Sequence, residues 1–297
     1  LGLEGIAFFT SIPLLQVSII GIGLGGGILN GETNALVADI SNEAEKGSRL
    51  SLLGAFYGIG ALGIPVLLSF LSEYYSFEII LQGTGMVMLI GILFCLGIRF
   101  PAPKQPQGFP IKEGLGLLKE SSLLLLSFIL FFQSGIEGVC NNWTTLYLGQ
   151  TTGIPENRAL IALTCMVAGL TVARLLLVVL FKKIKQETVL RTSLITAVAG
   201  FALLTFAPGF ARAAIGMALI GAGLASTFPV ILSIIGSRYA SLSGTAFSVA
   251  LVIALIGQTL LNSLTGIISQ GYGIVVYPYM MIVSLLIMLL LFKRSLK

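Results

Sequence analysis

Long apolar stretches recur along the chain, separated by short polar segments. A helix that crosses a bilayer core of about 30 Å needs roughly 20 residues at about 1.5 Å each. The stretches of that length are Leu14–Ala38, Leu50–Leu71, Ile79–Ile98, Leu123–Leu148, Leu160–Phe181, Val189–Phe206, Ala213–Ile235, Ala246–Ile268 and Ile274–Phe292. They are too continuous for the alternating pattern of barrel strands. The sequence therefore predicts an all-α membrane protein with these spans.

The longest polar stretch, residues 99–122, is rich in proline and divides the spans into three before and six after. Proline at this density ends helices, so an extended connector is expected there. We predict a complete C-terminal six-helix bundle over residues 123–297 and the remainder of an N-terminal six-helix bundle over residues 1–98. Leu1–Thr10 resembles the end of an earlier helix. The expected architecture is 6+6 helices, with the first two to three absent from this chain.

Composition and charge agree with a membrane protein. Hydrophobic residues make up 56% of the 297-residue chain and charged residues only 10%, which is far below the roughly 25% of a soluble domain. When the loops are assigned alternately to two sides, 14 of the 17 Lys and Arg residues fall on one side. That bias predicts a cytoplasmic connector and C-terminus in an inner or plasma membrane. The net charge of +5 follows this topology and gives no reason to expect nucleic acid as a partner.

The residue types exclude several chemistries. The chain contains no His, which excludes His-dependent triads, zinc-protease motifs and His proton relays. Its three cysteines, Cys95, Cys140 and Cys165, lie within apolar stretches and match no disulfide or metal pattern. We expect no enzyme activity, cofactor or metal.

Small residues predict close helix packing. Gly21, Gly23, Gly25 and Gly27 form two interlocking GxxxG pairs, and Gly54–Gly58 forms another. The spans Leu14–Ala38 and Ala213–Ile235 share a layout of clustered glycines, polar residues and an apolar run, which suggests two repeated halves. Pro229 removes a helix hydrogen bond and predicts a bend, although membrane helices also tolerate such prolines.

A carboxylate within a membrane span is costly and is by default a functional candidate. Glu137 lies mid-span, and the spacing of Gln133, Glu137, Asn141 and Thr144 puts all of them on one helical face. This polar face is interpreted either as the wall of a binding cavity, with Glu137 accepting hydroxyl hydrogen bonds or a proton, or as interhelical hydrogen bonding.

Other polar residues extend the candidate site. Trp143 is either an interfacial anchor or a platform on which a sugar ring stacks. Asn34 and Glu32 point to different sides of their helix, so one faces the cavity and the other is buried between helices. Gln258 and Asn262 form a further polar stripe, in which the amides suit a neutral sugar or link helices.

The chain resembles the major facilitator superfamily over essentially its whole length. Arg174 followed by LLLVVLFKKIKQ is similar to the superfamily's second-half loop motif. Gly135-x-Glu137 with Trp143 and Tyr147, and GxGxGG before Asn34-Ala-Leu, are similar to the fucose permease and glucose/galactose transporter group. One departure is that Asn30 stands where the fucose-permease pattern has a carboxylate.

The resemblance implies alternating access by two bundles that rock about a midplane site, as in a sugar–proton symporter. The substrate would be a monosaccharide or similar polyol and the coupling ion H⁺, and the protein would be a monomer in the bilayer. The candidate coupling carboxylates, Glu137 and Glu32, come from their positions in the spans and not from the resemblance, because Glu32 does not face the side that the family's carboxylate would. An efflux antiporter for amphipathic compounds is the nearest alternative. A nutrient sensor with a transporter fold and a membrane-embedded enzyme are more distant ones.

Overall fold

The computed structural model describes residues 1–101, 116–206 and 209–295. The α-helices are α1 (Gly2–Phe8), α2 (Ile12–Ile40), α3 (Lys46–Leu71), α4 (Phe77–Gly97), α6 (Ser121–Thr152), α7 (Glu156–Leu180), α8 (Gln186–Phe206), α9 (Phe210–Leu224), α10 (Thr227–Arg238), α11 (Ser243–Tyr272) and α12 (Tyr277–Ser295). Two 3-10 turns, η1 (Ala240–Leu242) and η2 (Ile274–Val276), precede α11 and α12. Most of the predicted connector lies outside the described residues, as do Lys104, Lys112 and Lys297.

Each predicted span coincides with a helix or a pair of helices, which confirms the all-α membrane fold. By length and composition, 8 segments of the described chain could cross a membrane, and α3, with 26 residues, covers the remaining predicted span. α6 is longer than predicted: its 32 residues end at Gly153, whose φ of 67° is the left-handed conformation that glycine adopts without strain.

The seventh predicted span is interrupted. α9 ends at Leu224 and α10 begins at Thr227, with Pro229 in the first turn of α10. Since proline has no N–H, the carbonyl four residues earlier, at Ala225, loses its helical donor. The predicted bend therefore occurs as a break between two helices.

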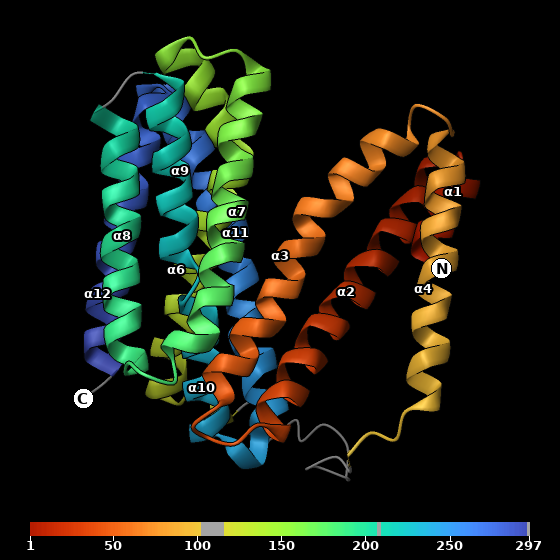
Figure 1. Cartoon of the computed structure of the whole chain (residues 1–297), viewed down its shortest axis with the longest axis horizontal. Helices are drawn as coiled ribbons and strands as arrows, with labels where there is room; N and C mark the ends of the chain where they lie inside the picture. Colours follow the sequence, from red (N-terminus) through yellow and green to blue (C-terminus); the bar gives the residue numbers. More distant parts are fainter. Residues whose placement is uncertain (102–115, 207–208, 296–297) are drawn as a thin grey trace. The chain divides into compact units, whose positions relative to one another are not determined.

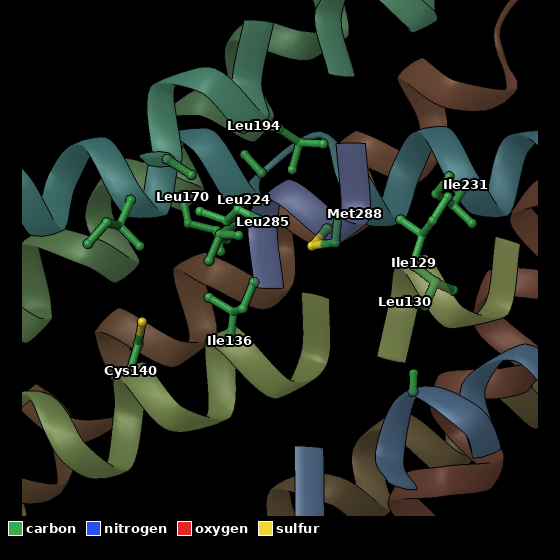
Figure 2. Packing of buried hydrophobic residues seen from close by; sticks show 14 of the residues in the cluster. Ile129, Leu130, Ile136, Cys140, Leu170, Leu194, Leu224, Ile231, Leu285 and Met288 are labelled. Carbon is green, nitrogen blue, oxygen red and sulfur yellow. The ribbon is translucent and has the colours of Figure 1, made fainter. Parts of the chain in front are cut away.

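The chain divides into two compact units, one of Leu1–Thr33 with Ala61–Gly108 and the other of Asn34–Gly60 with Phe109–Lys297. In the second unit, helices α6 to α12 run side by side as a bundle (Figure 1). α6 contacts α7, α9, α10, α11 and α12. Figure 2 shows Ile129, Leu130 and Ile136 of α6 in the cluster of buried apolar residues, which also includes Ile231, Met288 and leucines of other helices.

Glycines set how closely helices approach within this unit. A Cβ on Gly221 of α9 would lie 1.9 Å from the carbonyl oxygen of Met166 on α7, so the two backbones touch there. A Cβ on Gly58 would lie within 3.0 Å of Thr171 Cβ, which confirms packing at the Gly54–Gly58 pair. Among the earlier glycines, a Cβ on Gly21 would lie 3.9 Å from the Gly2 Cα of α1, whereas no described atom lies within 4 Å of a Cβ on Gly23, Gly25 or Gly27, so their close packing stays a prediction.

The first unit is smaller. α1 packs against α4, and the Glu4 carboxylate occupies the space beside Gly85 that a Cβ would fill. Most large apolar side chains of α4 are exposed, which is usual for a helix surface facing lipid.

Candidate functional site

The polar face predicted on α6 divides into a buried part and an exposed part. Gln133 and Thr144 are fully buried. Gln133 Nε2 donates to the carbonyl of Leu224, at the end of α9, over 3.1 Å. The Thr144 hydroxyl lies 3.0 Å from the Tyr277 hydroxyl. These two residues hold helices together, which is the interhelical alternative left open by the sequence.

Glu137 and Asn141 lie on the other edge of the same face. Glu137 is partly exposed and Asn141 is exposed. No hydrogen bond to the Glu137 carboxylate is found in the described part of the chain. α6 therefore presents an accessible carboxylate, with an amide one helical turn further along, in the middle of a membrane span.

Trp143 and Asn262 meet across the α6–α11 contact. The Trp143 indole N–H donates to Asn262 Oδ1 over 3.2 Å. The Asn142 amide donates to the same oxygen over 2.9 Å, and the Asn262 amide donates to the carbonyl of Gln258 over 2.7 Å. Asn262 is thereby fixed between two helices, and its oxygen is shared by two donors from α6.

Glycines permit this contact. A Cβ on Gly138 would lie 2.7 Å from the Gln258 side chain and 2.8 Å from Asn262 Nδ2. A Cβ on Gly266 would lie 3.3 Å from the ring of Trp143. Because the indole packs against α11 and donates to Asn262, Trp143 has an interhelical role that neither sequence interpretation included.

The predicted residues of α2 differ in burial. Asn34 is partly buried, whereas Glu32 is exposed. Within the described residues, Glu32 is therefore not buried between helices. Asn34 belongs to the same compact unit as α6, whereas Glu32 belongs to the other unit, so no geometry links Glu32 to Glu137.

Arg174 lies within α7, six residues before its end, and is buried with 6% of its surface exposed. Its Nη1 donates to the carbonyl of Gly54 on α3 over 3.0 Å. The Arg174 carbonyl accepts from the Ser51 hydroxyl over 2.8 Å. Its Nε has no partner among the described residues. The side chain thus faces α3, while the basic residues that follow lie in and around the turn after α7.

Several polar contacts not anticipated from the sequence join the α2–α3 segment to the later helices. Asp39 accepts from the Ser243 hydroxyl over 2.8 Å. Lys46, with 4% of its side chain exposed, pairs with Glu43 at 2.7 Å and donates to the Ser237 hydroxyl over 3.1 Å.

A hollow of about 440 Å³ lies beside these contacts, lined by Glu43, Gln186, Ser233, Ile234, Ser237 and Arg238. The sequence showed only that this region is charged. It could not show these contacts, because the residues that form them lie in segments far apart along the chain.

The fold defines a multi-pass helical membrane protein. The Major Facilitator Superfamily model matches residues 1–249. A relative in Sinorhizobium fredii (strain NBRC 101917 / NGR234), the uncharacterized transporter y4wD, is 23% identical over 269 residues, which cover 88% of this chain and 69% of the relative. The chain belongs to the Major Facilitator Superfamily, whose fold is that of transporters and not of enzymes.

Solved structures share the fold. The transporter FucP in the outward conformation matches with a TM-score of 0.81 and 20% identity, over 99% of this chain and 80% of that chain. The E. coli fucose:proton symporter FucP matches with a TM-score of 0.82 and 19% identity, over the same shares of 99% and 80%. The human organic anion transporter MFSD10 matches with a TM-score of 0.79 and 14% identity, over 98% of this chain and 74% of that chain. The predicted resemblance to the fucose permease group is confirmed for the fold.

Proposed function

We propose that this transporter moves a small neutral solute, a monosaccharide, by proton-coupled symport. The observation that carries the proposal is the accessible carboxylate of Glu137, held mid-span on α6 with no hydrogen-bond donor of its own among the described residues. A carboxylate in this setting can accept a proton in one state and a sugar hydroxyl in another. One structural neighbour is a fucose:proton symporter, which supports the same class of substrate.

Different roles are proposed for the other polar residues. Asn141 and Asn34 offer amides to sugar hydroxyls, since each amide has two donors and an acceptor. Gln258 is exposed and adds a third amide, while Asn262 and Trp143 hold α6 to α11 and shape the wall between them.

Glu32 is retained as a second candidate for proton coupling. Its helix also carries Asn34, but Glu32 is exposed whereas Glu137 is half-buried within its bundle, so Glu137 is the stronger choice.

The proposed mechanism is alternating access. A bundle that includes residues 1–98 and a bundle of residues 123–297 rock about the site, joined by the connector 99–122. The protein acts as a monomer in an inner or plasma membrane, with its C-terminus in the cytoplasm.

Uptake by the full-length protein in proteoliposomes tests the proposal. Labelled monosaccharides are supplied with and without an imposed inward proton gradient, next to a set of amphipathic cations. We expect at least one monosaccharide to accumulate only with the gradient. Gradient-driven extrusion of the amphipathic compounds, with no monosaccharide uptake, would show the drug/proton antiporter instead.

A further inference from the structure

The break between α9 and α10 gathers polar side-chain atoms that are buried and unpaired. Ser226 and Thr227 lie at the break and are fully buried, and so is Gln133, which meets the break from α6. In the part of the chain that the structure describes, neither hydroxyl makes a hydrogen bond, and Gln133 Oε1 makes none either. Burial without a partner is costly for each of these atoms, so a ligand at the break would stabilise the fold.

Equally buried hydroxyls elsewhere in this unit are paired. Ser127 and Thr265 each donate to the carbonyl four residues earlier in their own helix, over 2.7 Å. At Ser226 and Thr227 the helix is interrupted, and neither hydroxyl forms such a bond among the described residues. The unpaired hydroxyls therefore coincide with the break and are not a general feature of this bundle.

The Gln133 side chain is held at the break by its own amide group. Its Nε2 donates over 3.1 Å to the carbonyl of Leu224, the last residue of α9, so Oε1 of the same amide also lies at the break. Pro229 leaves a further oxygen available, because the Ala225 carbonyl has no helical N–H to accept from. The oxygens of residues 225–227 and of Gln133 are thus brought to one buried place.

These oxygens suit a small monovalent cation. Gln133 Oε1 and the Ala225 carbonyl only accept hydrogen bonds, so they would repel an anion, although the dipole of α10 favours one at this end. The dipole of α9, which ends here, has the opposite sign. The cluster as described includes no carboxylate, so a divalent ion would stay largely uncompensated in the membrane.

Among monovalent ions, Na⁺ fits the cluster best. In membrane transporters Na⁺ is coordinated by backbone carbonyls where a helix is interrupted. The set of oxygens at this break is small, which suits Na⁺ better than the larger K⁺. The expectation of no metal considered ligands such as His and Cys, whereas these ligands are neutral oxygens.

We propose that the α9–α10 break binds one Na⁺ ion, held by Gln133 Oε1, the hydroxyls of Ser226 and Thr227, and the Ala225 carbonyl. The ion ties α6 to the two halves of the interrupted helix. Glu137 is not one of the ligands, so the inference goes beyond the proposed proton coupling and does not depend on it. Glu137 is partly exposed one helical turn from Gln133, so the site lies one turn from an accessible surface.

The melting temperature of the full-length protein in detergent tests this site. NaCl replaces choline chloride at constant ionic strength, with KCl and sodium gluconate as comparisons. We expect Na⁺ to raise the melting temperature saturably, by about 5–10 °C at about a hundredfold excess over its dissociation constant, and K⁺ to raise it much less. A bound water would satisfy the same oxygens, but the protein would then melt equally in Na⁺, K⁺ and choline, which would overturn the inference. A shift that disappears in gluconate would show a bound anion and would overturn it as well.

Two variants, Thr227→Val and Ser226→Ala, assign the shift to the break. Thr265→Val is the matched control, because its hydroxyl is as buried but is paired. In choline chloride Thr227→Val should melt close to the wild type, since the lost hydroxyl is unpaired, and its Na⁺ shift should be absent. The control should melt lower in choline but keep the Na⁺ shift.

Equilibrium binding of radioactive Na⁺ gives a second readout if Thr227→Val does not fold. Ser226→Ala should bind Na⁺ at least about tenfold more weakly than the wild type, because a buried ligand is lost. Equal Na⁺ binding and equal Na⁺ shifts in Ser226→Ala and Thr265→Val would contradict a site at the break.

Discussion

The contact between α7 and α9 gives a quantitative prediction for Gly221→Ala. The added methyl carbon would lie 1.9 Å from the Met166 carbonyl oxygen, 2.8 Å from its carbonyl carbon and 2.9 Å from the Leu170 nitrogen. All of these are backbone atoms of a helix, so no side chain can turn away to make room. Restoring ordinary contact of 3.4 Å requires the helices to separate by about 1.5 Å at this point.

The expected cost is the difference between two terms. Overpacking of a well-packed interior costs about 1–3 kcal/mol, and a backbone clash belongs at the upper end of that range. Replacing a helical glycine by alanine returns up to about 1 kcal/mol through helix propensity. The net loss of stability is about 2 kcal/mol, which corresponds to a lowering of the melting temperature by about 4–8 °C.

Thermal unfolding of the purified protein in detergent, followed by the loss of the monodisperse peak in size-exclusion chromatography, measures this shift. Gly244→Ala is the control, because Gly244 lies in the first turn of α11 with no atom within 4 Å of its Cβ position. The control should melt at or slightly above the wild-type temperature. If Gly221→Ala melts within about 1 °C of the control, the backbone contact between α7 and α9 does not limit packing.

Three further substitutions test the buried polar groups by the same melting assay. Gln133→Met removes one hydrogen bond, but it also removes a buried Oε1 that has no partner in the described residues. The two effects oppose each other, so in sodium-free buffer the free energy of unfolding should change by less than about 1 kcal/mol. A loss above about 2 kcal/mol would show an additional partner for that oxygen. Tyr277→Phe deletes the hydroxyl that meets Thr144 at 3.0 Å and should cost about 0.5–1.5 kcal/mol, whereas no change would mean that the contact contributes nothing. Asn262→Leu leaves two α6 donors without their acceptor and should cost about 1–3 kcal/mol, with exposed Ser263→Ala as an unaffected control; equal melting of the two variants would contradict the α6–α11 bridge.

The fold could be predicted well from the sequence because the bilayer dictates helix length and hydropathy. The spans and the break near Pro229 depend only on local properties of the chain. The sequence also predicted that Gly54 and Gly58 pack closely against another helix. It did not predict that Gly54 faces Arg174, because the two residues lie 120 positions apart along the chain.

The candidate site was predicted less completely. Helical spacing grouped Gln133, Glu137, Asn141 and Thr144 correctly on one face, but spacing does not show which neighbour each residue meets. Two of them are fully buried and bonded inside the bundle, whereas the other two are accessible.

Asn142 was missed because it lies off that face. The structure shows that Asn142 donates a hydrogen bond to Asn262 on α11. Trp143 donates to the same oxygen, so it links two helices in addition to the roles considered from the sequence.

The most direct test of the proposed symport separates binding and exchange from proton coupling at Glu137. Counterflow and gradient-driven accumulation of a transported monosaccharide are measured for the full-length wild type, for Glu137→Gln and for Glu156→Gln, whose carboxylate is exposed in the first turn of α7. The proposal predicts that Glu137→Gln retains counterflow but no longer accumulates solute in response to a proton gradient, while Glu156→Gln behaves as wild type. Accumulation by Glu137→Gln at the wild-type level, with unchanged pH dependence, would contradict the proton role of Glu137.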